Sequence, residues 1–370
     1  MNTMDRRQLI MYPLSARKHQ LDMRKIAVSP DASSPTFAER HKAQIEVTAA
    51  NIIAARDAGS PVMFTFGAHL VKNGLAPVII RLIEEGWITH AATNGAGSIH
   101  DWEFGYIGVS TEDVRENTAN GRFGTWEETG RFLNLAIAAG GIEGLGYGAS
   151  VAKMIAENGI TIPPQDQLRA MLAACANDSS PSELIGAYAD LLYLTTSFDI
   201  PSGFMTVQHQ YPEFSIQNAA YRAGIPFTVH PGIGYDIIYT HPMNCGGAIG
   251  RGAVTDFLSY AESVSRLSGG VHVTIGSAVM APMIFEKAMS MANNLLLQHG
   301  SRIEGHKLVI VDIQDGGDWD WNTGEPPKDH PAYYLRFCKS FYRMGGSLEY
   351  ICLDNKLFLL GLYNRLKEMR

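Results

Sequence analysis

The chain has 370 residues, of which 46% are hydrophobic and 18% charged, with a formal net charge of −7 at pH 7. This composition is typical of a globular protein with a large core, and the absence of a basic segment argues against nucleic-acid binding. No apolar run approaches the roughly 18 residues that span a bilayer, and the four cysteines are too scattered for a disulfide framework or a zinc site. We therefore expect a cytoplasmic protein without a membrane segment.

The first 40 residues are expected to form an arm with little regular structure. Ser29–Pro35 is rich in serine, proline and aspartate, which is typical of a loop. A helix is predicted directly afterwards, over residues 36–58.

A strand–loop–helix–strand unit follows the arm. Val62–Phe66 is a short apolar run that Gly67 ends, and apolar residues then repeat at helical spacing as far as Ile83. The next strand is expected at Ile88–Thr93. Such a unit is the building block of a parallel sheet.

The rest of the chain continues this alternation. Four more strands are predicted, at Pro226–His230, Val271–Ile275, Leu308–Ile313 and Leu348–Leu353. Helices are predicted over residues 214–223, 253–267, 280–297 and 329–344. The expected architecture is α/β: one domain over residues 41–370, with a doubly wound, mostly parallel, Rossmann-like sheet, helices on both faces and a helical insertion at about 105–200.

In such sheets ligands bind beyond the carboxyl ends of the strands, so the loops after the strands are the places to search. The loop predicted over residues 94–103 contains Gly95-Ala96-Gly97-Ser98, followed at once by His100, Asp101 and Glu103. Small residues let an anionic ligand approach the backbone amides, which suits a nucleotide phosphate. A tight turn with close helix packing is the alternative interpretation.

The loop predicted over residues 276–282 repeats this design, with Gly276 and Ser277 before Pro282 at a helix start. Two such loops favour a dinucleotide site more than either does alone. The glycine-rich stretch Gly144–Gly148 follows a helical pattern instead of a strand, so we interpret it as a turn between helices.

The loop predicted over residues 312–321 carries four aspartates and two tryptophans just after a strand. Acids and aromatic rings together suit a cationic amine. A solvated acidic turn is an equally weighted alternative.

Histidines are numerous, and His209, His230 and His241 lie in one part of the sequence. Their spacing is not that of a zinc protease, so each is more simply a hydrogen-bonded structural residue and no metal is predicted. Neither a Gly-x-Ser-x-Gly elbow nor a phosphate-binding P-loop occurs, which argues against a hydrolase of that type and a P-loop enzyme.

Six segments that end or follow expected strands resemble, in their order and spacing, motifs of the deoxyhypusine synthase family. They are Phe64–Gly74 (family TSNLISSG), Thr93–Asp101 (TTAGGIEED), Ile225–Ile238 (IPVFSPALTDGSLGDMI), Gly276–Val279 (GGGVV), Asp315–Asp318 (DGSD) and Leu353–Asn355 (ADA). The resemblance runs from about residue 60 to the C-terminus, and it is least clear over the helical region.

The resemblance implies an NAD-binding fold, a homotetramer with active sites across subunit interfaces, and hydride transfer from a polyamine to NAD. It implies that NAD contacts Ala68, His69, Thr93, Gly95, Ala96, Gly97, Asp101, Gly276, Ser277, Asp354 and Asn355. It also implies that a small amine or polyamine is held by Asp236, Asp315, Asp318 and Trp319.

Two catalytic residues are candidates. In the family a lysine eight residues after a proline carries an imine, and here Lys339 lies eight residues after Pro331. A surface lysine on a helix is the alternative interpretation of Lys339. The family's substrate-contacting histidine falls on Met280–Pro282 and is missing, and an aspartate falls on Pro231. Our hypothesis is that His100 replaces the missing group.

We therefore expect an NAD-dependent enzyme that acts on a small amine or polyamine, other than a true deoxyhypusine synthase. The alternatives are a nucleotide- or metabolite-binding protein without this chemistry and a metal-dependent hydrolase that uses the histidines. A homo-oligomer is expected from the resemblance alone.

Overall fold

The computed structural model describes residues 3–178, 182 and 184–370, and the chain forms two compact units. The helical unit contains residues 1–25, 98–222 and 231–256. The sheet unit contains residues 26–97, 223–230 and 257–370. The predicted arm thus contributes to both units. Whether the chain folds as the single domain expected over residues 41–370 stays a prediction.

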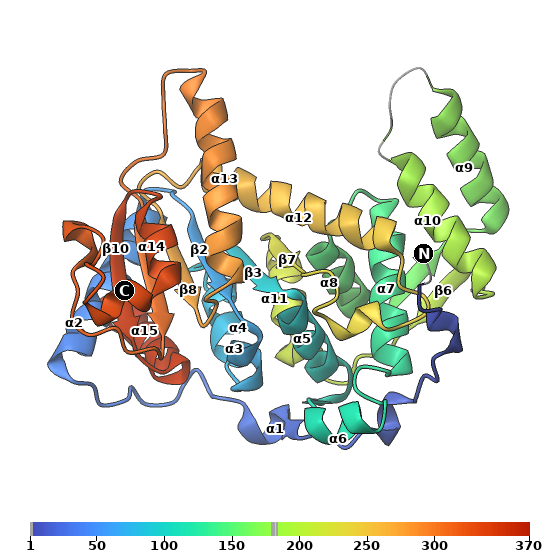
Figure 1. The fold of residues 1–370 in the computed structure, drawn as a ribbon, viewed down its shortest axis with the longest axis horizontal. Helices are drawn as coiled ribbons and strands as arrows, with labels where there is room; N and C mark the ends of the chain where they lie inside the picture. Colours follow the sequence, from blue (N-terminus) through green and yellow to red (C-terminus); the bar gives the residue numbers. More distant parts are fainter. Residues whose placement is uncertain (1–2, 179–181, 183) are drawn as a thin grey trace. The chain divides into compact units, whose positions relative to one another are not determined.

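The sheet unit is built on six parallel strands in the order β10-β9-β8-β2-β3-β7 (Figure 1). The strands are β2 (Val62–Phe66), β3 (His90–Asn94), β7 (Phe227–His230), β8 (Val271–Ile275), β9 (Lys307–Asp312) and β10 (Ser347–Cys352). All six were predicted from the sequence to within about two residues at each end. The doubly wound α/β prediction is confirmed.

Helices cover both faces of this sheet (Figure 1). They are α2 (Glu39–Asp57), α3 (Ala68–Lys72), α4 (Ala76–Glu84), α13 (Met280–Leu297), α14 (Arg336–Tyr342), α15 (Asn355–Met369) and the C-terminal part of α12 (Gly246–Ser265). Helix α2 contacts β2, β8 and β10 and packs along α15. Its buried residues Ile45, Ala49 and Ile52 recur at helical spacing, which explains why this segment forms a helix on the sheet.

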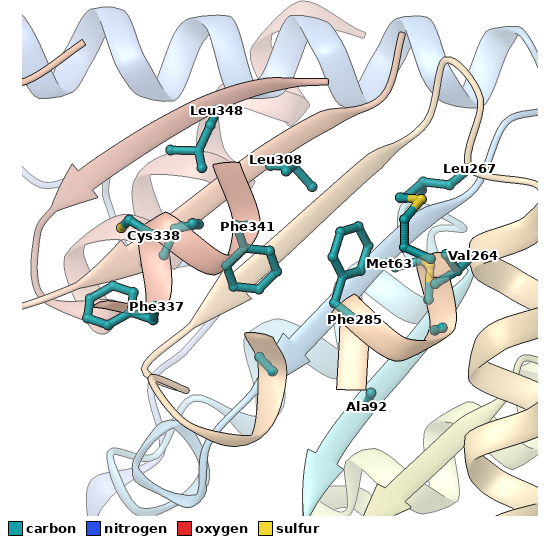
Figure 2. Packing of buried hydrophobic residues seen from close by; sticks show 14 of the residues in the cluster. Met63, Ala92, Val264, Leu267, Phe285, Leu308, Phe337, Cys338, Phe341 and Leu348 are labelled. Atoms are coloured by element: carbon teal, nitrogen blue, oxygen red, sulfur yellow. The ribbon is translucent and has the colours of Figure 1, made fainter. Parts of the chain in front are cut away.

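The opposite face carries a large apolar core (Figure 2). Met63, Ala92 and Leu308 of the strands pack there with Phe285 of α13 and Phe341 of α14. Side chains alternate between the faces of a strand, so Phe64 and Phe66 are buried on the other side. A strand buried on both faces reads as a continuous apolar run, as Val62–Phe66 does.

The helical unit contains most of the predicted insertion. It is formed by α5 (Gly95–Ile107), α6 (Val114–Ala119), α7 (Glu127–Gly141), α8 (Tyr147–Glu157), α9 (Gln165–Asn177), α10 (Leu184–Ser197) and α11 (Ile216–Ala223). Two short antiparallel pairs were not predicted: β1 (Leu21–Asp22) with β4 (Val109–Ser110), and β5 (Gly159–Ile162) with β6 (Gly203–Thr206). Residues 142–146 join α7 to α8, and α8 begins at Tyr147, so the prediction of a turn between helices at Gly144–Gly148 is confirmed for its first three residues.

Several predicted boundaries are wrong, among them the start of α12, which lies at Gly246 instead of residue 253. Residues 94–103 do not form a loop, because α5 begins at Gly95 directly after β3. Asn94 Oδ1 accepts a hydrogen bond from the amide of Gly97 at 2.9 Å and so caps the new helix. Only residues 336–342 of the predicted helix at 329–344 are α-helical, and a 3₁₀ turn over Pro331–Tyr334 precedes them.

Candidate functional site

The carboxyl ends of the strands lie level with one another in the sheet unit. Phe66 of β2 is paired with Thr93 of β3 and with Ile275 of β8. Ile275 is paired in turn with Val311 of β9. Level ends bring the residues that follow each strand to one edge of the sheet, where α/β proteins bind their ligands.

The chain reverses its direction of winding between β2 and β8. From β2 it adds β3 and then β7 on one side, and afterwards β8, β9 and β10 on the other side. Counted along the chain, the order across the sheet is 3-2-1-4-5-6, which is the order of dinucleotide-binding folds. The crevice outside β2 and β8 is therefore the expected place for a dinucleotide.

Two glycines meet where the winding reverses, just beyond the ends of β2 and β8. The amide of Gly67 donates to the carbonyl of Ile275 at 3.2 Å. A Cβ on Gly67 would lie 2.3 Å from the carbonyl oxygen of Gly276, too close for any side chain. Gly276 itself has a φ of +56°, a conformation that favours glycine. Of the predicted cofactor residues, Gly276 and Ser277 thus directly follow β8 at the point of reversal, while Gly67 was not in the predicted set.

The predicted residues at the start of α5 also pack tightly. The hydroxyl of Thr93 donates to the carbonyl of Phe66 at 2.9 Å, so it ties β3 to β2. A Cβ on Gly97 would lie 2.1 Å from that hydroxyl. Gly97 is therefore needed for packing, while Gly95 and Ala96 occupy the first turn of the helix.

The end of α3, which follows β2, contacts the start of α15, which follows β10. The side-chain amide of Asn73 donates to Asn355 Oδ1 at 2.9 Å. Asp354 accepts from the amide of Lys356 at 2.8 Å and caps α15. Ala68 and His69 form the first turn of α3, and His69 is exposed. The roles of these residues in cofactor binding stay predictions.

The acidic segment after β9 lines a cavity of about 510 Å³ beside the edge strand β10. The lining residues are Arg40, Ala43, Gln44, Asp318, Trp319, Asp320, Trp321, Leu348, Glu349 and Tyr350. Two of the predicted substrate residues, Asp318 and Trp319, are among them. Asp315 is exposed at the loop and accepts from the amide of Gly317 at 2.8 Å.

Lys339 on α14 is buried, with 9% of its surface exposed. Its Nζ lies 3.4 Å from a carboxylate oxygen of Glu325 and 3.7 Å from the ring centroid of Tyr333. An acid and an aromatic face therefore hold the ammonium group. Its role as an imine carrier stays a prediction.

Asp101 of α5 lies in the helical unit and is 1% exposed. Its carboxylate accepts from the hydroxyl of Ser215 at 2.6 Å, from the amide of Ile216 at 2.7 Å and from the side chain of Gln217 at 2.9 Å. Burial raises the pKa of Asp101, and the bonds from Ser215 and Gln217 act in the opposite direction. The contacts in the structure give Asp101 the role of a cap for α11; the predicted contact with NAD stays untested.

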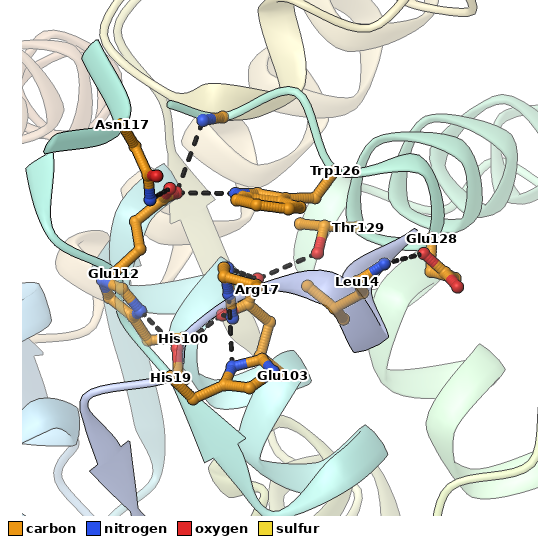
Figure 3. Close-up of polar contacts among 12 residues, drawn as sticks. Leu14, Arg17, His19, His100, Glu103, Glu112, Asn117, Trp126, Glu128 and Thr129 are labelled. Carbon is orange, nitrogen blue, oxygen red and sulfur yellow. Dashed lines mark hydrogen bonds and ion pairs between the residues drawn. The ribbon is translucent and has the colours of Figure 1, made fainter. Parts of the chain in front are cut away.

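His100 and Glu103 belong to a buried polar network in the same unit (Figure 3). Arg17 donates to both oxygens of Glu103, at 2.8 and 2.6 Å. The hydroxyl of Ser110 donates to Glu103, and Ser110 Oγ lies 2.8 Å from His100 Nδ1. A hydroxyl has one proton, so Nδ1 of His100 is the donor in this contact.

Burial alone would raise the pKa of Glu103, but the charge and hydrogen bonds of Arg17 outweigh it and lower the pKa. Sequence reasoning missed Arg17 and Ser110. One signal was available: Glu103 stands among apolar residues of a helix, and a buried acid requires a cationic partner.

Asp236 follows β7 in the chain and is 7% exposed. Tyr147 of α8 and Tyr239 lie within its electrostatic influence in the helical unit. Burial, together with the charge of Asp236, raises the pKa of Tyr239 to about 12. The same two causes raise the pKa of Tyr147. The tyrosines were not predicted, because nothing in the sequence links residue 147 to residue 236.

The histidines do not form a metal centre in the part of the chain that the structure describes. There, no group of three His, Cys, Asp or Glu side chains is placed to hold a metal ion. His230 instead contacts the hydroxyl of Thr228 at 3.0 Å in the sheet core. The described helices likewise include none that is both long enough and apolar enough to cross a membrane.

No protein-family model matches this chain, and no curated protein matches it significantly. Among solved structures, AgrE in a ternary complex with ornithine and NAD⁺ aligns with a TM-score of 0.44 and 16% identity, over 90% of this chain and 34% of AgrE. ArgZ, an arginine dihydrolase from the ornithine–ammonia cycle in Cyanobacteria, aligns with a TM-score of 0.43 and 14% identity, over 89% of this chain and 33% of ArgZ.

A conserved LOR/SDH protein from Methanococcus maripaludis S2 aligns with a TM-score of 0.43 and 13% identity, over 92% of this chain and 74% of that protein. The chain spans about a third of the length of AgrE and ArgZ. Likenesses of this size assign neither a family nor an activity. None of the three is described as a deoxyhypusine synthase, so that resemblance is unsupported here and stays a prediction.

Proposed function

We propose that this chain is an NAD-dependent enzyme that acts on a small amino compound. The observation that carries the proposal is the 3-2-1-4-5-6 strand order, with the bare backbones of Gly67 and Gly276 at the crevice where the winding reverses. Dinucleotide-binding folds have this order and require small residues at that place, because the pyrophosphate approaches the backbone closely.

The residues at the crevice fit a dinucleotide in part. A Cβ on Gly276 would meet nothing within 4 Å, which leaves room for a phosphate, and the first turn of α5 presents backbone amides near the strand ends. The strand after β2 ends in Asn94, where many NAD-binding folds have an acid for the ribose. This departure predicts a mode of ribose binding that does not use a carboxylate on β3. When bound, NAD would supply a hydride acceptor.

The proposed substrate class rests on the acids after β9. Asp315 and Asp318 are exposed carboxylates close in sequence to Trp319, a combination that suits an organic cation. Asp236, Lys339 and His100 remain proposed substrate and catalytic residues. A more specific form of this proposal is the transfer of an aminobutyl group, as in deoxyhypusine synthases. We also propose a homotetramer, which sedimentation of the purified chain would test.

Calorimetric titration of nucleotide-stripped protein with NAD tests the proposal. We expect micromolar binding, and we expect Gly67→Ala to weaken it by about tenfold or more, because the new Cβ displaces the Gly276 carbonyl. Gly250→Ala is the matched control, since a Cβ there meets nothing within 4 Å. Absence of NAD binding to folded protein would overturn the proposal.

A binding protein without turnover is the second candidate. It predicts NAD binding without NADH absorbance on addition of any amine. The metal-dependent hydrolase has no support, because no group of three His, Cys, Asp or Glu side chains among the described residues is placed to hold a metal ion.

A further inference from the structure

We infer that the dinucleotide site binds NADP, which carries a phosphate on its adenosine ribose, as well as NAD, and that Asn94 is the residue that permits this. The inference rests on the proposed function, because it concerns the ribose end of the same site. It adds the range of nucleotides that the site binds and the residue that sets this range.

Asn94 is the last residue of β3, which follows β2 along the chain and lies beside it in the sheet (Figure 1). In dinucleotide-binding folds an acid at this place accepts a hydrogen bond from the 2′-hydroxyl of the ribose, which favours NAD. Phe66 of β2 is paired with Thr93 of β3, so Gly67 and Asn94 follow at the same level of the two strands. Asn94 therefore occupies the position of that acid.

One side-chain group of Asn94 is already engaged, and the other can serve a ligand. Oδ1 accepts from the amide of Gly97 in the first turn of α5. Nδ2 donates to no residue that the structure describes, and Asn94 is only half-buried. An N–H donor can bond to a ribose hydroxyl oxygen or to a phosphate oxygen, whereas a carboxylate accepts from the hydroxyl and repels the phosphate.

The segments that follow β2, β3 and β8 within the sheet unit contain no carboxylate. These segments, all described by the structure, are residues 67–74, 95–97 and 276–282. Their only ionisable side chains are those of His69 and Lys72, which are cationic when protonated. On the other side of Asn94, its strand partner is His230, and burial lowers the pKa of His230 to about 3. His230 is therefore neutral at pH 7, and no charge in these segments opposes a phosphate on the ribose.

A ribose position with neither an acid nor an arginine discriminates little between the two nucleotides. An acid would reject NADP by repulsion, and an arginine would favour it by pairing with the 2′-phosphate. Strong selectivity usually includes such a repulsive element against the wrong ligand. We therefore expect the Kd for NADP to lie within about tenfold of the Kd for NAD.

The test is a calorimetric titration of the nucleotide-stripped full chain with NAD and with NADP, repeated on Asn94→Asp. Aspartate caps a helix as well as asparagine does, so this variant keeps an acceptor for the amide of Gly97 and adds a charge. We expect it to weaken NADP by about tenfold or more and to change NAD by less than about threefold. The weakening of NADP should diminish as salt is added, because salt screens the repulsion.

Two further variants separate charge at the ribose from other effects. Asn294→Asp adds the same charge at an exposed position in the last turn of α13, about 21 Å along that helix from Met280, and should change neither nucleotide. Asn94→Ser also keeps a helix cap but adds no charge, so NADP should still bind within about tenfold of NAD. Thermal unfolding shows whether each variant is folded.

The outcomes keep this inference apart from the proposed function. If NAD binds and NADP binds more than about a hundredfold more weakly in the unmodified chain, the inference is overturned and the proposed function stands. Equal effects of folded Asn94→Asp protein on both nucleotides would also overturn it. If neither nucleotide binds to folded protein, both ideas fail. The comparison in the unmodified chain needs no variant and decides the question even where a variant does not fold.

Discussion

The helical unit buries a charged pair, whereas the strands of the sheet unit bury neutral histidines. The interior of the helical unit holds an ion pair, Arg17 with Glu103, whose side chains are each 1% exposed. The interior of the sheet unit holds a histidine on each of β3, β7 and β8, namely His90, His230 and His272, and burial lowers the pKa of each to about 3. These histidines are neutral at pH 7.

The difference follows from the partners that each fold supplies. Glu103 receives two bonds from a guanidinium and one from Thr129, enough to offset the desolvation of a charge. The histidines receive hydroxyls: His90 contacts Ser263 and Thr228, and His272 contacts the hydroxyl of Tyr260 at 2.8 Å. Hydroxyls can satisfy a neutral ring, but they cannot balance a buried charge.

The largest expected effect comes from breaking the ion pair. Arg17→Met leaves Glu103 buried without its counter-charge and should lower the free energy of unfolding by about 3–5 kcal/mol. Urea denaturation measures it. Lys18→Ala is the control, because that lysine pairs with Glu116 at the surface and should change stability by less than about 1 kcal/mol. Similar losses in the two variants would contradict the comparison.

A smaller effect is expected from a neutral donor to a buried acid in the same unit. Ser215→Ala removes the hydroxyl that bonds to Asp101, while the amides of Ile216 and Gln217 remain. We expect a loss of about 1.5–3 kcal/mol, since bonds to charged groups are stronger than neutral ones. Thermal and urea unfolding report it. A loss below about 0.5 kcal/mol would mean that the remaining donors suffice.

The sheet unit predicts a pH effect. Unfolded histidines take up protons as the pH falls below about 6.5, whereas the folded ones do so only near pH 3. Stability is therefore fully present above about pH 6.5 and falls with the pH below it, by up to about 1.4 kcal/mol per pH unit for each histidine.

His272→Gln sharpens this prediction. Whatever it costs at pH 7, it should reduce the loss between pH 6.5 and 5.5 by about 1 kcal/mol, because one titrating group is gone. His299→Gln removes an exposed histidine and serves as the control. The measurement is the free energy of unfolding of both variants between pH 6.5 and 5.5. If it changed equally with pH in the two variants, His272 would not be held neutral.

Much of the sheet unit could be predicted from the sequence. Val62–Phe66 and Val271–Ile275 are short apolar runs that glycine ends, and local pattern is sufficient to identify such strands. The same pattern placed Gly276, Ser277 and Asp318 after strands. It failed at Gly95, because small residues after a strand suit either a loop or the first turn of a helix.

By itself, then, the sequence determined the parallel α/β class and the segments that lie at the carboxyl edge of the sheet, since these depend on neighbouring residues. Only the tertiary structure decided the strand order, the approach of Gly67 to Gly276, and the partners of Glu103. Arg17 and Glu103 are 86 positions apart. A pairing over such a separation is set by how the elements pack, which no local pattern records.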